Sequence, residues 1–125
     1  MAVATLAHEA CALHPRLNSD LLMSAAIVHD VGKLREFELV AEIALSQEGR
    51  LLGHVALGHQ MVLERIACIG GLPAGKSLAL AHCILAHHGA DALPARRFAS
   101  AEALALFRLN ALDAGVKGAL EHGLG

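Results

Sequence analysis

An imidazole and a carboxylate stand side by side after an apolar segment of the chain, since His29 and Asp30 directly follow residues 21–28, LLMSAAIV. A buried carboxylate is unfavourable unless it is paired or bound to a cation, and His and Asp together are suitable ligands for a divalent metal. Gly32 is expected to end a helix here in a left-handed turn that directs Lys33 back over the pair, where its ammonium would suit a phosphate oxygen. Asp30 and Lys33 are therefore the candidate catalytic residues.

A His–Asp dipeptide alone is more simply explained as a hydrogen-bonded pair at a helix end, so the metal hypothesis needs further ligands. Four candidates follow downstream: His54, His87, His88 and Asp113. Taken singly, each has an ordinary explanation. His54 could face solvent, the consecutive histidines could end a helix next to its dipole, and Asp113 could pair with Lys117. One centre with two metal ions would explain all of them, because they would otherwise be unpaired polar groups in an apolar core.

The helical period helps to sort the remaining polar residues. Asp113 shares a helix face with Leu106 and Leu109, so its side chain is expected to point into apolar packing. His82 is five residues before His87 and is rotated off that face, which leaves it a supporting or core role. The histidines expected not to bind metal are His8, His14, His59 and His122.

The composition favours one all-α domain. The chain has 125 residues, of which 55% are hydrophobic, mostly the strong helix formers Ala and Leu. Helices are expected over residues 1–13, 21–28, 51–69, 74–88 and 101–120, with Asn18, Ser19 or Asp20 capping the second helix and Ser100 capping the last. Residues 36–40 alternate in polarity and predict a short strand-like or irregular connection, residues 47–50 a turn, and residues 91–98 a loop.

Charge and aromatic content limit the classes of function. Aromatic residues make up 2% of the chain, without Trp or Tyr, and the formal charge is −2, so neither a base-stacking platform nor a basic footprint for nucleic acid is indicated. Cys11, Cys68 and Cys83 form no CxxC pair and have apolar neighbours, which predicts reduced, buried thiols in a cytoplasmic protein. No apolar run predicts a membrane span or a signal peptide.

The ordered set of motifs resembles the HD-domain metal-dependent phosphohydrolases. The resemblance is carried by HDVGK at 29–33, GH at 53–54, HHG at 87–89 and Asp113. Within that superfamily, EGRLLGH at 48–54, LAHHG at 85–89 and LDA at 112–114 look like the HD domain of YhaM-type 3′→5′ exoribonucleases. The resemblance covers nearly the whole chain and implies a bundle of about five to six helices, forming a single HD domain over residues 1–125.

The resemblance implies roles for particular residues. The metal ligands would be His29, Asp30, His54, His87, His88 and Asp113, with Lys33 near the scissile phosphate. One or two divalent ions would be bound, and oxygen and imidazole ligands without Cys suit Mn, Fe, Co or Mg better than structural Zn. The substrate would be a nucleotide or single-stranded nucleic acid, hydrolysed at a phosphodiester or phosphomonoester bond, and homo-oligomerisation stays open.

Two departures from the family pattern stand out. The family has a further His ligand on its first helix, and counting back from His29 places it just before Met1, so the domain is expected to lack the start of its first helix. The exoribonuclease branch also carries an N-terminal OB-fold domain that has no counterpart in this sequence.

Two alternative functions remain. Residues 70–77, GGLPAGKS, match the P-loop pattern G-x-x-x-x-G-K-[ST], which would make the chain a nucleotide-binding protein if a strand preceded the motif. Loss of the upstream His would instead suit a catalytically inactive HD domain that serves as a regulatory module.

Overall fold

The computed structural model describes residues 2–39 and 43–125, and this part of the chain is mostly helical. Its helices are α1 (Ala2–Leu13), α2 (Ser19–Val28), α3 (Lys33–Glu36), α4 (Gln47–Ile69), α5 (Ala74–Ala86) and α6 (Ala101–His122), with a 3-10 turn, η1 (Ala90–Ala92). Two short strands, β1 (Phe37–Leu39) and β2 (Ile43–Leu45), pair antiparallel between α3 and α4. The predicted all-α class is confirmed.

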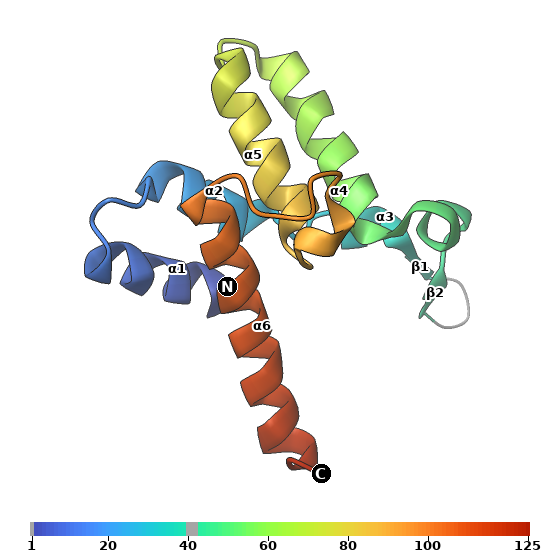
Figure 1. Ribbon diagram of the computed structural model, residues 1–125. Helices are drawn as coiled ribbons and strands as arrows, with labels where there is room; N and C mark the ends of the chain where they lie inside the picture. The colour runs from blue at the N-terminus through green and yellow to red at the C-terminus, as the bar shows by residue number, and fades with distance from the viewer. Residues whose placement is uncertain (1, 40–42) are drawn as a thin grey trace.

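The helices pack around a small-residue core (Figure 1). α1 packs on α2 and α6, while α5 packs on α2, α4 and α6. Ala7, Ala25, Ala86 and Ala103 are fully buried, and such small side chains let the helix backbones approach closely. α4 and α5 form an antiparallel hairpin, and the C-terminal half of α6 extends past the other helices (Figure 1). In this arrangement, the middle of α6 lies beside the C-terminal ends of α2 and α5.

The predicted caps of α2 and α6 are present. Asn18 Oδ1 accepts a hydrogen bond from the Leu21 amide at 3.1 Å, and Ser100 Oγ accepts one from the Ala103 amide at 3.1 Å. Each satisfies an amide that has no partner inside its helix. Glu102 Oε2 accepts from the Asn18 amide at 2.9 Å and so joins the starts of the two helices.

The prediction of a left-handed turn at Gly32 is wrong. Gly32 has φ −59° and ψ −22°, which is right-handed helical geometry, and the chain turns from α2 into α3 without a left-handed residue. Glycine is needed here for space: a Cβ on Gly32 would overlap the His54 carbonyl oxygen and lie 2.5 Å from the Gly58 amide nitrogen. The turn that carries Asp30 is thereby packed directly on the backbone of α4.

Among the described residues between α3 and α4, the strand-like alternative predicted from the sequence is present, but the predicted turn at residues 47–50 is not. The alternating stretch forms β1 only over Phe37–Leu39, and Val40 lies outside the described residues. The turn predicted at residues 47–50 is instead the first turn of α4, which Ser46 caps by accepting from the Gly49 amide at 2.9 Å. Gly53, with φ 75° and ψ 166°, interrupts α4 directly before His54.

The P-loop alternative is wrong. The five residues before the motif, 65–69, belong to α4 and are helical, whereas a P-loop requires a β-strand at that position. Gly70 and Gly71 have positive φ values of 72° and 84° and end α4, and α5 begins at Ala74. Within the described residues, the GGLPAGKS segment is therefore a helix-to-helix connection.

The three cysteines are all free, but they differ in exposure. Cys83 is buried, Cys11 is half-buried and Cys68 is exposed, so the predicted burial is wrong for Cys68. Burial raises the pKa of the Cys83 thiol to about 11. None of the described helices is both long enough and apolar enough to cross a membrane.

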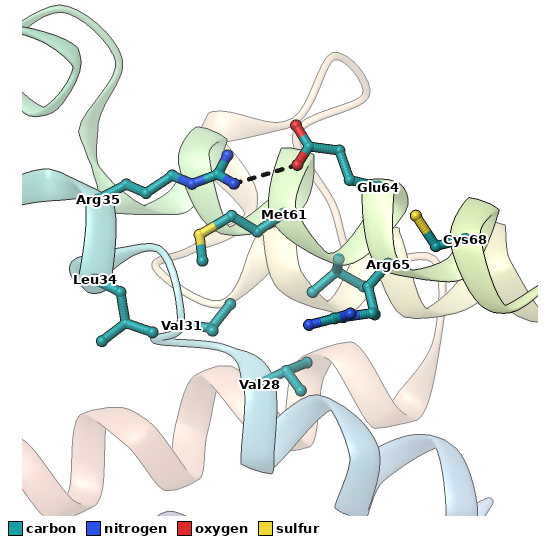
Figure 2. A pocket seen from close by; sticks show the side chains of 9 residues that line it. Val28, Val31, Leu34, Arg35, Met61, Glu64, Arg65 and Cys68 are labelled. Carbon is teal, nitrogen blue, oxygen red and sulfur yellow. Dashed lines mark hydrogen bonds and ion pairs between the residues drawn. The ribbon is translucent and has the colours of Figure 1, made fainter.

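A pocket of about 430 Å³ opens between the end of α2 and the middle of α4 (Figure 2). Its walls are mostly apolar, from Val28, Val31 and Met61, and an ion pair of 3.3 Å between Arg35 and Glu64 lies at its edge. None of the predicted metal ligands lines it, so this pocket is separate from the polar cluster described next.

Candidate metal centre

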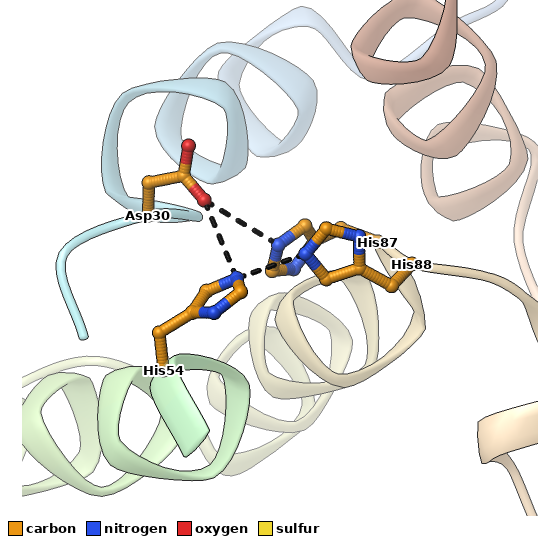
Figure 3. A group of neighbouring side chains, drawn as sticks. All are labelled: Asp30, His54, His87 and His88. Carbon is orange, nitrogen blue, oxygen red and sulfur yellow. Dashed lines mark hydrogen bonds and ion pairs between the residues drawn. The ribbon is translucent and has the colours of Figure 1, made fainter. Parts of the chain in front are cut away.

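Four of the predicted ligands converge from three separate segments of the chain (Figure 3). Asp30 lies in the turn after α2, His54 follows the kink in α4, and His87 and His88 lie at the end of α5. One ligand atom from each lies within 4.8 Å of all the others. Residues as far apart in sequence as Asp30 and His88 thus share one small volume.

The separations within this cluster suit a shared cation. His54 Nε2 lies 2.8 Å from His88 Nε2, and Asp30 Oδ1 lies 3.7 Å from His54 Nε2 and 3.6 Å from His87 Nε2. Ligand atoms that bind one metal at about 2.0–2.2 Å stand roughly 3 Å apart. The observed separations therefore need little adjustment to place these atoms around one ion.

Two buried histidines have one ring nitrogen bonded and the other left over. His29 Nδ1 lies 2.7 Å from the Ala26 carbonyl oxygen and His87 Nδ1 lies 2.6 Å from that of Ile84. A carbonyl only accepts, so each Nδ1 carries a hydrogen, and in the neutral form of each ring Nε2 presents a lone pair. Neither buried Nε2 has a hydrogen-bond partner, although buried polar atoms are normally satisfied. Such an oriented lone pair is typical of a metal-binding histidine.

His29 and Asp113 lie beside the four-residue cluster. His29 Nε2 is 3.2 Å from Asp30 Oδ2, and His29, Asp30, Asn110 and Asp113 line one pocket of about 230 Å³. Asp113 is not among the four clustered residues, and its Oδ2 lies 3.0 Å from the ammonium of Lys117. The ion pair that the sequence offered as the ordinary explanation is therefore present, and a metal-binding role for Asp113 stays a prediction.

Lys33 lies at the edge of the same site. Its Nζ is 3.5 Å from Asp30 Oδ2, and its side chain is half-exposed. Lys33 lies three positions after Asp30, and the right-handed helical geometry at Gly32, in place of the expected left-handed turn, brings the two side chains together. The ammonium is thus free to reach an oxygen of a molecule bound over the cluster.

The electrostatic surroundings favour the metal-binding forms of Asp30 and His88. The His29 and His87 imidazoles hold the pKa of Asp30 well below its usual range, against the opposing effect of burial. Burial, and next the neighbouring His87 and His54, lower the pKa of His88. Burial disfavours a charged His29, but the Asp30 carboxylate and the Ala26 carbonyl outweigh it and raise the pKa of His29. A carboxylate and a neutral imidazole are the forms that bind metal.

The sequence left two residues without a definite role, and the structure gives each of them a hydrogen-bond partner. Glu36, expected in a strand-like connection, ends α3 with its Oε2 3.3 Å from His54 Nδ1. His82 Nε2 accepts from the Ala99 amide at 3.0 Å and so holds the loop that leads to α6, and a supporting role for His82 at the metal centre stays a prediction. The local pattern around Glu36 carries no signal, because its partner lies eighteen residues along the chain.

An all-α bundle that gathers three histidines and an aspartate is the framework of a metal-dependent hydrolase. Residues 1–115 match the family model of the HD domain. The chain belongs to the HD-domain family, a class of metal-dependent phosphohydrolases. The predicted resemblance is confirmed.

Comparison with curated proteins shows which members of the family this chain resembles. The chain is 35% identical over 80 residues to the 3′-5′ exoribonuclease YhaM of Oceanobacillus iheyensis, a match that covers 62% of this chain and 24% of that protein. It is 38% identical over 79 residues to the 3′-5′ exoribonuclease YhaM of Bacillus subtilis, again over 62% of this chain and 24% of that protein. The chain thus matches about a quarter of the length of these relatives. No solved structure matches it.

Proposed function

We propose that this chain is the catalytic domain of a metal-dependent phosphodiesterase that removes nucleotides from the 3′ end of RNA. The observation that carries the proposal is the convergence of Asp30, His54, His87 and His88 within 4.8 Å, from three segments of the fold. The likeness to proteins named 3′-5′ exoribonucleases supports RNA as the substrate.

We propose two groups of ligands, supported by the arrangement of the side chains. Asp30, His54, His87 and His88 would hold one divalent ion, while His29, Asp30 and Asp113 would hold a second, so that Asp30 is shared. We expect Mn, Fe, Co or Mg, because the donors are imidazole nitrogens and carboxylate oxygens. A bound divalent ion supplies Lewis-acid activation of water and of the phosphoryl group.

The chain's own residues would orient the metal ligands and the phosphate group of the substrate. The hydrogen bonds of His29 and His87 to backbone carbonyls orient their rings before a substrate binds. Lys33 would donate to a non-bridging phosphate oxygen and stabilise the charge that develops there. Together these residues would position the phosphodiester for in-line attack of water on phosphorus, in which the bond to the 3′ oxygen of the shortened RNA breaks and that oxygen takes a proton from the water.

The decisive experiment incubates the chain and Mn²⁺ with single-stranded RNA labelled at its 5′ end and, separately, with bis(p-nitrophenyl) phosphate. We expect labelled products that shorten one nucleotide at a time, and loss of both activities in Asp30→Asn. The matched control is Asp91→Asn, because Asp91 is exposed in η1 outside the cluster. Cleavage of the small diester without RNA shortening would contradict the exoribonuclease proposal. Metal binding without any turnover would favour the inactive regulatory module.

The remaining features of the protein are proposals of the same kind. We place it in the cytoplasm, since three free thiols suit a reducing compartment. The assignment of residues 1–125 to a single HD domain stays a prediction. So does homo-oligomerisation, which light scattering of the purified protein would test.

A further inference from the structure

His54 differs from the other buried ring ligands in the partner of its Nδ1 atom. His29 and His87 each stand at the C-terminal end of a helix, where the Ala26 and Ile84 carbonyls of the last turn are available to accept from Nδ1. His54 stands at the start of a helical run, directly after the kink at Gly53. Helix carbonyls point away from such a start, so the acceptor for His54 has to come from another element.

Glu36 supplies that acceptor from α3. Its Oε2 accepts from the His54 backbone amide at 2.8 Å and lies 3.3 Å from His54 Nδ1. The Glu36 side chain is 12% exposed and that of His54 19%, so solvent competes little for this contact. A carboxylate can only accept, and the ring contact is therefore a hydrogen bond when Nδ1 carries the proton.

The same oxygen caps the helix that begins at His54. Gly53 has φ 75° and breaks the helical run, which leaves the following amides without partners inside it. Glycine has no side chain that could cap them, and Glu36 does so from a different part of the chain. A negative charge at this end of a helix is also favourable.

The backbone of Glu36 is itself held tightly. The Ser46 amide donates to the Glu36 carbonyl at 2.9 Å, and the Ser46 hydroxyl donates to the Arg35 carbonyl at 2.6 Å. Gly49 approaches the same Glu36 carbonyl so closely that a Cβ on Gly49 would overlap its oxygen. The start of α4 thus fixes Glu36 in the place from which it reaches His54.

We infer that Glu36 is a positioning residue that holds His54 in the tautomer with Nδ1 protonated and the Nε2 lone pair facing Asp30 and His88. The inference rests on the proposed function, in which His54 Nε2 binds a metal ion. A carboxylate partner on the far nitrogen both orients a metal-binding imidazole and increases its basicity. His29, His54 and His87 then share one arrangement, with Nδ1 bonded to an oxygen and Nε2 turned inward.

The experiment uses the whole chain labelled with ¹⁵N-histidine, without metal and at a pH where the rings are neutral. Two-bond ¹H–¹⁵N spectra report the tautomer of each ring, and titration with Mn²⁺ reports its dissociation constant. We expect wild-type His54 to carry its proton on Nδ1, and Glu36→Ala to populate the other tautomer and weaken Mn²⁺ binding about 10- to 100-fold. Glu36→Gln, which keeps an accepting oxygen, should restore most of both properties.

The matched control is Glu64→Ala, which removes a carboxylate from the surface ion pair with Arg35 and should change neither property. A wild-type His54 protonated on Nε2 would overturn the inference without any variant, even if Glu36→Ala fails to fold. A Glu36→Ala protein of lower melting temperature with unchanged tautomer and affinity would show that Glu36 only caps the helix. If wild-type protein binds no Mn²⁺, the proposed function fails, while the metal-free tautomer still decides the role of Glu36.

Discussion

Gly32 lies against the backbone of His54 so closely that a single added methyl group at position 32 would overlap the His54 carbonyl oxygen. Gly58, one turn further along α4, meets the same turn: a Cβ there would lie 3.2 Å from the Gly32 amide nitrogen. This contact fixes the distance between the turn that carries Asp30 and the helix that carries His54. The relative position of Asp30 and His54 therefore depends on the close packing at two glycines.

Gly32→Ala should destabilise the domain strongly. The new Cβ would meet backbone atoms that cannot move aside cheaply, and such overpacking destabilises by about 1–3 kcal/mol, which lowers the melting temperature by roughly 5–15 °C. Urea denaturation measures the change. Gly115→Ala is the control, because a Cβ on Gly115 meets nothing within 4 Å in the middle of α6, and it should stabilise by about 0.5–1 kcal/mol. Equal stabilities of the two variants would contradict the packing argument.

The sequence was enough to choose the candidate residues, but it did not predict which distant residues come into contact in the folded chain. The four residues that cluster could be singled out because histidines and aspartates are conspicuous between Ala- and Leu-rich helices, and His87 lies at a helix end as expected. Gly32 was assigned a left-handed turn because local rules favour one, whereas its real constraint is the backbone of α4. The role of Glu36 could not be predicted for the same reason, because its partner His54 comes close only when β1 and β2 pair and the chain reverses direction.

Lys33→Met should reduce catalysis while leaving metal binding nearly unchanged. The ammonium of Lys33 lies 3.5 Å from Asp30 Oδ2 but has no lone pair to offer a cation. Removing one donor that stabilises developing charge reduces kcat about 10²- to 10³-fold. Kinetics with the small phosphodiester, together with Mn²⁺ titration, measure the two effects. Lys76→Met on α5 is the control, and a large loss of Mn²⁺ affinity in Lys33→Met would argue against a role at the phosphate.

Asp113 should be available to a second ion in spite of its pairing with Lys117. The lysine side chain is 61% exposed, and an exposed ion pair contributes about 0.5–1 kcal/mol at most, so Lys117→Met should tighten the weaker Mn²⁺ site about two- to fivefold. Asp113→Asn should reduce the bound metal from two ions to one. Elemental analysis and calorimetry test both changes. Two ions in Asp113→Asn would exclude Asp113 as a ligand.

Stabilisation by metal should weaken as the pH falls, because protons compete with the cation for the imidazole lone pairs. The pKa of Asp30 is held well below its usual range and that of His88 is lowered by burial, so these two keep their metal-binding forms below neutral pH. His29, with its raised pKa, has to release a proton and should be the first to lose the ion. The Mn²⁺-induced rise in melting temperature should therefore be largest near pH 8 and largely lost near pH 5.5, roughly one unit below the ordinary histidine pKa. Differential scanning fluorimetry with and without EDTA measures it, with Asp30→Asn as the variant that shows no rise at any pH. A rise that stays constant across this range would mean that histidines are not the ligands.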